Sequence, residues 1–279
     1  VRVGGSSSSG RFGSLFSFIL SVALLFGGSS AWARNQYWRG DGSDNKWTTA
    51  ANWSGDSSKN AEFWGSRFNP ANTGYVIDID GNQTASWKLY VCAVGSEDTP
   101  LVFRNKDNSY TLTVGDAKND TTGYYIAYGE GDAWLQLERG KYTTTSVAHW
   151  YIGASSGNFE GHVIVANDAI LESKGKMFLY NGTVDVKSGG KMTLNTWCAV
   201  GALASKTGKV EIDGGEVECK VNRMTIGDVD KSTGIVVIKN GGKFSNTGSS
   251  AAGITVGQVE SGTLEVDNGE VNLGERTFN

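Results

Sequence analysis

The feature that most constrains the fold is a motif that recurs through the second half of the chain. In each copy an apolar residue and a glycine precede a polar stretch, and then comes glycine–x–apolar–x–apolar. This second part is clearest at Gly161–Val165, Gly208–Ile212, Gly234–Ile238 and Gly262–Val266. With two weaker copies included, the apolar pairs begin at residues 135, 163, 184, 210, 236 and 264, at intervals of 21 to 28 residues. Repeats of this length are typical of stacked supersecondary units.

Within each copy the apolar residues alternate with other residues, which predicts a β-strand because successive side chains of a strand point to opposite faces. Turns rich in Asn, Asp and Gly follow, as in Asp213–Gly215 and Lys239–Gly242. These residues tolerate the positive φ that tight corners need. We expect two inward ladders, made of Val184, Val210, Val236 and Leu264 and of Val186, Ile212, Ile238 and Val266.

The repeats predict an all-β fold, a β-solenoid (parallel β-helix) of about eight rungs over residues 75–279. At about 4.8 Å per rung, the stack would be roughly 40 Å long. One rung cannot bury its apolar face alone, whereas stacking buries that face continuously. The alternative is a β-sandwich, which also consists of many short strands. The repeated phase of the motif favours the solenoid.

The N-terminus has the three parts of a secretory signal peptide. Arg2 and Arg11 precede the apolar run Leu15–Phe26, and Ala31–Ala33 has the small–x–small pattern of a cleavage site. The run of 12 residues is too short to span a bilayer as a helix. We therefore predict a signal peptide over residues 1–33 and a mature chain that does not span the membrane. The alternative is a short buried helix.

Export would bring the three cysteines, Cys92, Cys198 and Cys219, into an oxidising compartment. An odd number allows one intramolecular bridge at most. Cys198 and Cys219 lie about one repeat apart and could be neighbours. Small cysteines also pack in apolar cores as thiols, and we prefer this interpretation. The disulfide state stays open at this point.

Residues 34–74 differ from the repeats and hold four of the nine tryptophans, Trp38, Trp47, Trp53 and Trp64. An open solenoid end needs a cap, and aromatic side chains bury the most area per residue. We therefore predict a tryptophan-rich N-terminal cap. The alternative is a binding platform, because flat rings can stack on the apolar faces of sugars. These four tryptophans are the candidate binding residues.

This segment supports a resemblance to a known group of proteins. The W-x-G-x-G pattern at Trp38–Gly42, followed by Trp47 and by Asn52 and Trp53, resembles the opening of large bacterial surface proteins of the autotransporter-passenger type. Their I-G…G-T-L-x-V-x-x-G-G repeats are similar to Gly262–Val266. The resemblance implies a secreted or surface-displayed β-helical protein of bacterial origin. It carries over no catalytic residues.

Members of that group usually carry a membrane anchor in a C-terminal region. This chain begins with Val1 and stops at Asn279, just after a repeat and without a polar capping segment. We expect a fragment of a longer protein, truncated at the C-terminus, whose missing region would supply the anchor.

Carboxylates are the only side chains that suggest catalysis. Three pairs alternate onto one face: Asp78 with Asp80, Glu211 with Asp213, and Glu216 with Glu218. Paired carboxylates can hydrolyse glycosides, or bind calcium in a lyase. No basic residue recurs beside them at a fixed spacing, and acidic residues at period two are also typical of a solvated outer face. We expect the solvated face.

Other chemistry finds little support in the sequence. The net charge of −4 and the absence of a basic tract argue against nucleic-acid binding. Two histidines, His149 and His162, leave almost no room for a histidine-based metal site, and His162 is expected to point outward. Asp41–Asn45 loosely resembles the start of a calcium loop but lacks its distal glutamate, which favours a simple turn.

The sequence therefore predicts a structural or adhesive protein, secreted or at the bacterial cell surface, with no catalytic, cofactor or metal residues. Its expected partners are extracellular glycans or a host or matrix surface. The alternatives are a polysaccharide-active enzyme, a lyase or glycosidase, on the same rod and a carbohydrate-binding module at residues 37–64.

Overall fold

The computed structural model describes residues 36–39, 41–55, 61–64, 75–129, 131–220, 223–248 and 253–274. The predicted signal peptide lies outside these residues. Nearly all regular structure in the described part is β-strand, with one 3₁₀ turn, η1 (Ala50–Asn52). The strands form three sheets, called A, B and C here.

Sheet A has ten strands. In spatial order they are β2 (Trp53–Gly55), β1 (Gln36–Trp38), β3 (Ala61–Trp64), β6 (Lys88–Cys92), β9 (Gly123–Ile126), β12 (His149–Ile152), β15 (Met177–Leu179), β18 (Cys198–Val200), β21 (Met224–Ile226) and β24 (Ile254–Val256).

Sheets B and C have eight strands each. Sheet B consists of β4 (Val76–Ile79), β7 (Leu101–Asn105), β10 (Ala133–Glu138), β13 (Gly161–Ala166), β16 (Gly182–Lys187), β19 (Thr207–Asp213), β22 (Thr233–Lys239) and β25 (Ser261–Asp267). Sheet C consists of β5 (Gln83–Ala85), β8 (Thr111–Val114), β11 (Lys141–Thr144), β14 (Ile170–Ser173), β17 (Lys191–Leu194), β20 (Glu216–Cys219), β23 (Lys243–Asn246) and β26 (Glu270–Asn272).

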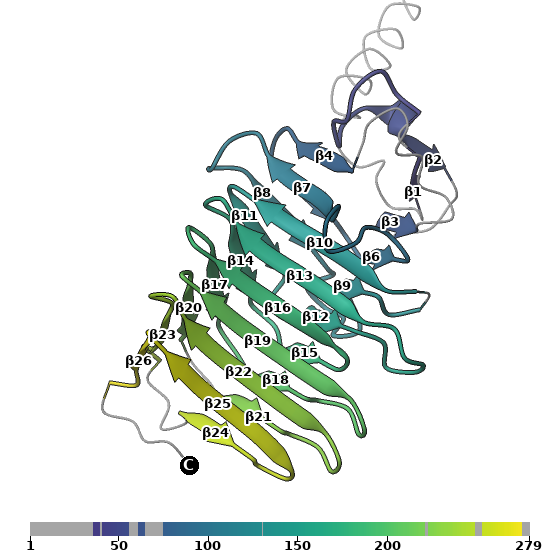
Figure 1. Ribbon diagram of the computed structural model, residues 1–279. Coiled ribbons are helices and arrows are strands. Elements are labelled where there is room, and N and C mark those ends of the chain that lie inside the picture. Colours follow the sequence, from purple (N-terminus) through teal and green to yellow (C-terminus); the bar gives the residue numbers. More distant parts are fainter. Residues whose placement is uncertain are drawn as a thin grey trace, which may run out of the picture.

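The chain winds as a solenoid, because from β4 onward every third strand returns to the same sheet beside its predecessor (Figure 1). All neighbours in this part pair in parallel, as Val184 with Val210 and Val236 with Leu264 do. The predicted β-solenoid of about eight turns is confirmed. The sandwich alternative is wrong, since such sandwiches consist of antiparallel sheets.

Alternate residues of each strand point inward and form the core. Of the first predicted ladder, Val184, Val210 and Val236 are fully buried, whereas Leu264 is only partly buried. Of the second, Val186, Ile212 and Ile238 are fully buried. Two large aromatic side chains on neighbouring turns, Tyr124 and Trp150, stack inside the core with their ring centroids 3.7 Å apart. Val266, on the last strand of sheet B, continues the ladder of Val186, Ile212 and Ile238, but it is 48% exposed.

The recurring glycine pair of the motif marks a corner where the backbone touches itself. In one copy Gly201 has a φ of +76°, which favours glycine, and a Cβ on Gly208 would lie 2.3 Å from the backbone nitrogen of Gly201. The same contact recurs between Gly227 and Gly234 at 2.2 Å. The motif is therefore a steric requirement of the corner that leads into each sheet B strand.

Candidate functional site

Three of the four candidate tryptophans are buried in an aromatic cluster at the first turns. Trp38, Trp47 and Trp53 are 0%, 5% and 8% exposed. Each ring packs within 6.0 Å of the Phe63 ring, measured between centroids, and Phe63 contacts Phe103 on the next turn at 4.9 Å. The three rings thus leave little surface on which a sugar could stack.

The backbone of the same segment extends sheet A. Strand β1 pairs in parallel with β3 and antiparallel with β2, which puts Trp38 opposite Trp53. Trp53 donates its indole N–H to the carbonyl of Trp47 at 2.7 Å. Trp64 ends β3 opposite Cys92, and its side chain lies outside the described residues.

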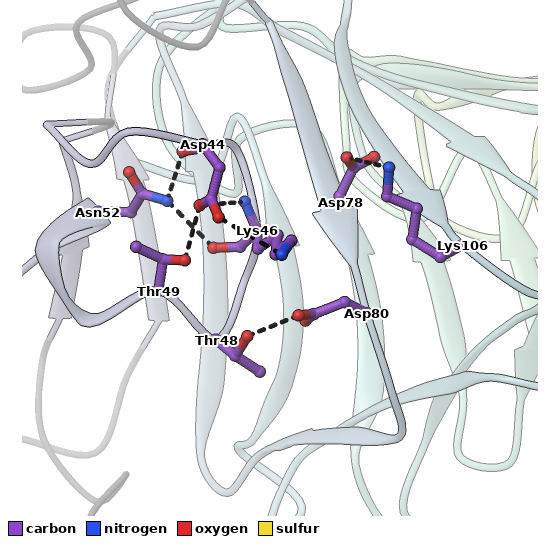
Figure 2. Close-up of polar contacts among 8 residues, drawn as sticks. All are labelled: Asp44, Lys46, Thr48, Thr49, Asn52, Asp78, Asp80 and Lys106. Atoms are coloured by element: carbon purple, nitrogen blue, oxygen red, sulfur yellow. Dashed lines mark hydrogen bonds and ion pairs between the residues drawn. The ribbon is translucent and has the colours of Figure 1, made fainter.

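Figure 2 shows how the predicted turn around Asp44 is held. The Asp44 carboxylate accepts hydrogen bonds from the Thr49 hydroxyl at 2.6 Å and from the Lys46 amide at 3.2 Å. The amide of Asn52 donates to the carbonyls of Asp44 and Lys46. In the described part of the chain, no group of three or more His, Cys, Asp or Glu side chains could hold a metal ion.

The carboxylates of Asp78 and Asp80 have separate partners (Figure 2). Asp78 is 2% exposed and forms ion pairs with Arg104 at 2.8 Å and Lys106 at 2.7 Å. Asp80 accepts a hydrogen bond from Thr48 at 2.6 Å. Basic residues therefore do lie beside Asp78, one turn away. The sequence misses them because turns of unequal length give no fixed spacing.

The outer face of sheet B continues this pattern as a ladder of mostly alternating charge. Lys187 illustrates it, with ion pairs to Asp213 on the next turn at 3.3 Å and to Asp185 on its own strand at 3.8 Å. Like charges that lie opposite each other on neighbouring turns would repel, whereas such ion pairs place opposite charges side by side. One run of this ladder consists of Asp78, Arg104, Glu138 and Ala166, and another consists of Lys187, Asp213, Lys239 and Asp267.

A groove of about 480 Å³ lies on this outer face. Asp185 and Glu211 line it and lie in register on β16 and β19. At one end the rings of Trp134 and His162 stack with centroids 4.5 Å apart. We call this site the sheet B groove; its lining includes Trp134, His162, Thr183, Asp185, Lys209 and Glu211.

The carboxylates of Asp185 and Glu211 have different environments. Burial raises the pKa of Asp185; the Lys187 ammonium offsets part of this effect, and Glu211 raises the pKa further. Burial would also raise the pKa of Glu211, but hydrogen bonds from Lys209 and Lys239 outweigh it and lower that pKa. Adjacent acids thus hold their protons to different degrees.

The remaining predicted acidic pair lies elsewhere. Glu216 and Glu218 belong to β20 of sheet C, whereas Glu211 and Asp213 belong to β19 of sheet B. Glu218 forms an ion pair with Lys191 at 3.2 Å. The structure therefore does not gather the predicted acids into one site.

Sheet A carries an outer feature that the sequence analysis missed, a ladder of aromatic rings. Tyr90, Tyr125, Tyr151 and Phe178 lie on four successive strands, with centroids 4.6 to 5.6 Å apart. Burial raises the pKa of Tyr90 to about 12. The signal was present, since each aromatic residue directly precedes an inward aliphatic residue. The last two contacts are stacked, so those ring faces are occupied by neighbouring turns.

His149 lies beside this ladder and couples folding to pH. Burial lowers the pKa of His149 below its usual 6.5, although a hydrogen bond with Ala148 and the charge of Asp120 offset part of this shift. Its Nδ1 accepts a hydrogen bond from the amide of Lys176 at 3.1 Å, which requires an unprotonated nitrogen. The folded protein therefore favours neutral His149.

We expect stability to fall as the pH drops below about 6.5, because the unfolded chain then binds the His149 proton before the folded chain does. Urea unfolding at about pH 7.5 and 5.5 measures the loss, and His149→Gln should reduce it. An identical pH dependence in wild type and variant would contradict this assignment. The depressed pKa of Glu172 affects stability only at lower pH.

The structure places the three cysteines, Cys92, Cys198 and Cys219, in the core as thiols with 0% exposure. Burial raises the pKa of Cys198, and Cys219 raises it further. We predict that an aromatic disulfide reagent labels all three thiols in denaturant but none rapidly in the folded protein, because both access and thiolate are suppressed. A total of one reactive thiol after denaturation would instead reveal a disulfide.

Within the described residues, no helix has the length and apolar character needed to cross a bilayer. No protein-family model matches the sequence, and neither a curated protein nor a solved structure shows significant similarity to it.

Proposed function

We propose that this chain is an exported structural and adhesive protein that binds at its surface without catalysis. The observation that carries this proposal is the unbroken parallel stacking from β4 to β25, which gives a rod with long outer faces (Figure 1). Such repeat proteins use extended surfaces for binding. The repeat and the autotransporter resemblance support display at a bacterial surface, with extracellular glycans or a matrix surface as partners.

We also propose that the tryptophan-rich segment caps the N-terminal end of the rod. The burial of Trp38, Trp47 and Trp53 against Phe63 supports this role, because the cluster packs apolar surface that a first turn would otherwise expose. The same burial disfavours the sugar-binding platform that the sequence left open.

Export is tested by expressing the 279-residue chain in a bacterium and analysing the secreted fraction. We expect a processed protein that starts at Arg34, because the basic, apolar and Ala-x-Ala parts precede that position. The control replaces Leu24 and Leu25 by arginine, which should keep the protein in the cytoplasm. Cytoplasmic retention of the unprocessed wild-type chain would contradict the proposal.

A polysaccharide-active enzyme is the second candidate. It is favoured by the opposite pKa shifts of Asp185 and Glu211, since such pairs serve as acid and base in glycoside hydrolysis. A glycan screen that records both binding and chain length separates the two functions. Binding without shortening is the expected result. Shortening that is lost in Asp185→Asn and in Glu211→Gln would establish the enzyme.

A further inference from the structure

The sheet B groove is a candidate ligand site, and its position in the sheet excludes the addition of a peptide as an extra β-strand. The four strands that form it, β10, β13, β16 and β19, each pair with a neighbour on both sides. Their backbone groups are therefore engaged in the ladders, and a peptide cannot add to them as an extra strand. A ligand on this face must be recognised by side chains alone.

The side chains of the groove offer polar atoms at a regular spacing. Thr183 is in register with Lys209, and Asp185 with Glu211, so the backbone positions that carry these side chains lie about 4.8 Å apart along the rod. A pyranose unit in a linear sugar chain has a similar length and carries several hydroxyls. The Nε2 atom of His162 has no hydrogen-bond partner in the described residues, and the Glu160 carboxylate lies 3.6 Å from it.

The charged side chains that line the groove indicate which charge a ligand should carry. Its lining includes four carboxylates, Glu97, Glu160, Asp185 and Glu211, against two ammonium groups, Lys187 and Lys209, and His162.

The lysine ammonium groups of the groove are divided unequally between Glu211 and Asp185. Glu211 is held by Lys209 and by Lys239, which lies beside the groove. Lys187 lies closer to Asp213, at 3.3 Å, than to Asp185, at 3.8 Å. Asp185 is therefore less closely paired with lysine than Glu211 is, and a ligand cation would stabilise its charged form.

We propose that the sheet B groove binds oligosaccharides of amino sugars, with a sugar ammonium group paired to Asp185 and the hydroxyls to Thr183, Lys209 and Glu211. This inference rests on the proposed adhesive function and names the ligand class of that surface.

The test is calorimetric titration of the full chain with a β-1,4-linked glucosamine hexasaccharide and with its fully N-acetylated form. The two probes share a backbone and differ in charge. At a mildly acidic pH, at which the amines are protonated, we expect the amine form to bind about tenfold more tightly. Asp185→Asn should weaken binding of the amine form about tenfold and leave the acetylated form unchanged.

Glu265→Gln is the matched control, because Glu265 continues the Asp185 ladder three turns away on β25 and does not line the groove. Its binding should equal that of the wild type, and circular dichroism confirms that both variants fold. Thr183→Val, which removes only a hydroxyl, should weaken both sugars alike.

Equal binding of the two sugars, or wild-type affinity in Asp185→Asn, would overturn the inference. If other glycans still bind in the screen, the adhesive function survives that result. Shortening of the hexasaccharide would contradict the non-catalytic function and leave the binding site in place.

Discussion

Gly234→Ala is expected to destabilise the folded chain by about 3 kcal/mol or more. A Cβ at this position would lie 2.2 Å from the nitrogen of Gly227 and 2.4 Å from the carbonyl oxygen of Val200. These two atoms are joined by a hydrogen bond of 2.9 Å, so the methyl group would force them apart. Overpacking of this kind costs about 1–3 kcal/mol, and a lost buried backbone bond adds about 1–3 kcal/mol.

Alanine substitutions at two other glycines serve as controls that separate steric crowding from backbone strain. Gly241 has a φ of +79° with nothing within 4 Å of an added Cβ, and Gly81 meets only the flexible end of Gln83 at 3.6 Å. Gly241→Ala should therefore show backbone strain alone, about 1–2 kcal/mol, and Gly81→Ala almost no loss. Urea unfolding followed by circular dichroism gives all three values. A loss in Gly234→Ala no greater than that in Gly241→Ala would contradict the corner contact.

Trp53→Ala is expected to cost about 3–5 kcal/mol, the usual range for a buried tryptophan. The ring lies within 5.6 Å of the rings of Trp38, Trp47 and Phe63, measured between centroids. Its loss would leave a cavity at the first turns and would also leave the Trp47 carbonyl without its indole donor. Unfolding in urea, followed by tryptophan fluorescence, measures the effect.

The control is Trp134→Ala, because Trp134 is only partly buried and stacks on His162 at the surface of the groove. Losing one such stacked pair costs about 0.5–1.5 kcal/mol. The comparison distinguishes a cap from a binding platform. If Trp53→Ala kept full stability and lost glycan binding instead, the tryptophan cluster would be a ligand site.

The inward half of the fold could be predicted from the sequence because each inward position obeys a strict rule. Val184, Val210 and Val236 must be apolar and must keep one phase relative to the glycine corners, so their alternation survives differences in loop length. The exposure of Val266 could not be predicted from the motif, which is the same in every copy. It reflects the position of β25 at the edge of sheet B.

The outer half could not be predicted, because its partners are set by neighbouring turns. The ion pair of Lys187 with Asp213 joins residues 26 apart, whereas that of Asp78 with Lys106 joins residues 28 apart, so no single spacing reveals the ion pairs. Pairing by alternation along one strand, such as Glu211 with Asp213, identifies a shared face and not a shared site. The groove emerges only when adjacent turns are placed in register.

Oxidative cross-linking directly tests the register of neighbouring strands on the outer face of sheet B. Thr183 lies opposite Lys209, so their Cα atoms are about 4.8 Å apart, within the range that a disulfide spans. We predict that the double variant Thr183→Cys, Lys209→Cys forms an intramolecular bridge under mild oxidation. The offset pair Thr183→Cys, Glu211→Cys, about 8 Å apart, should not. Bridging of the offset pair alone would contradict the stacking register and the groove built on it.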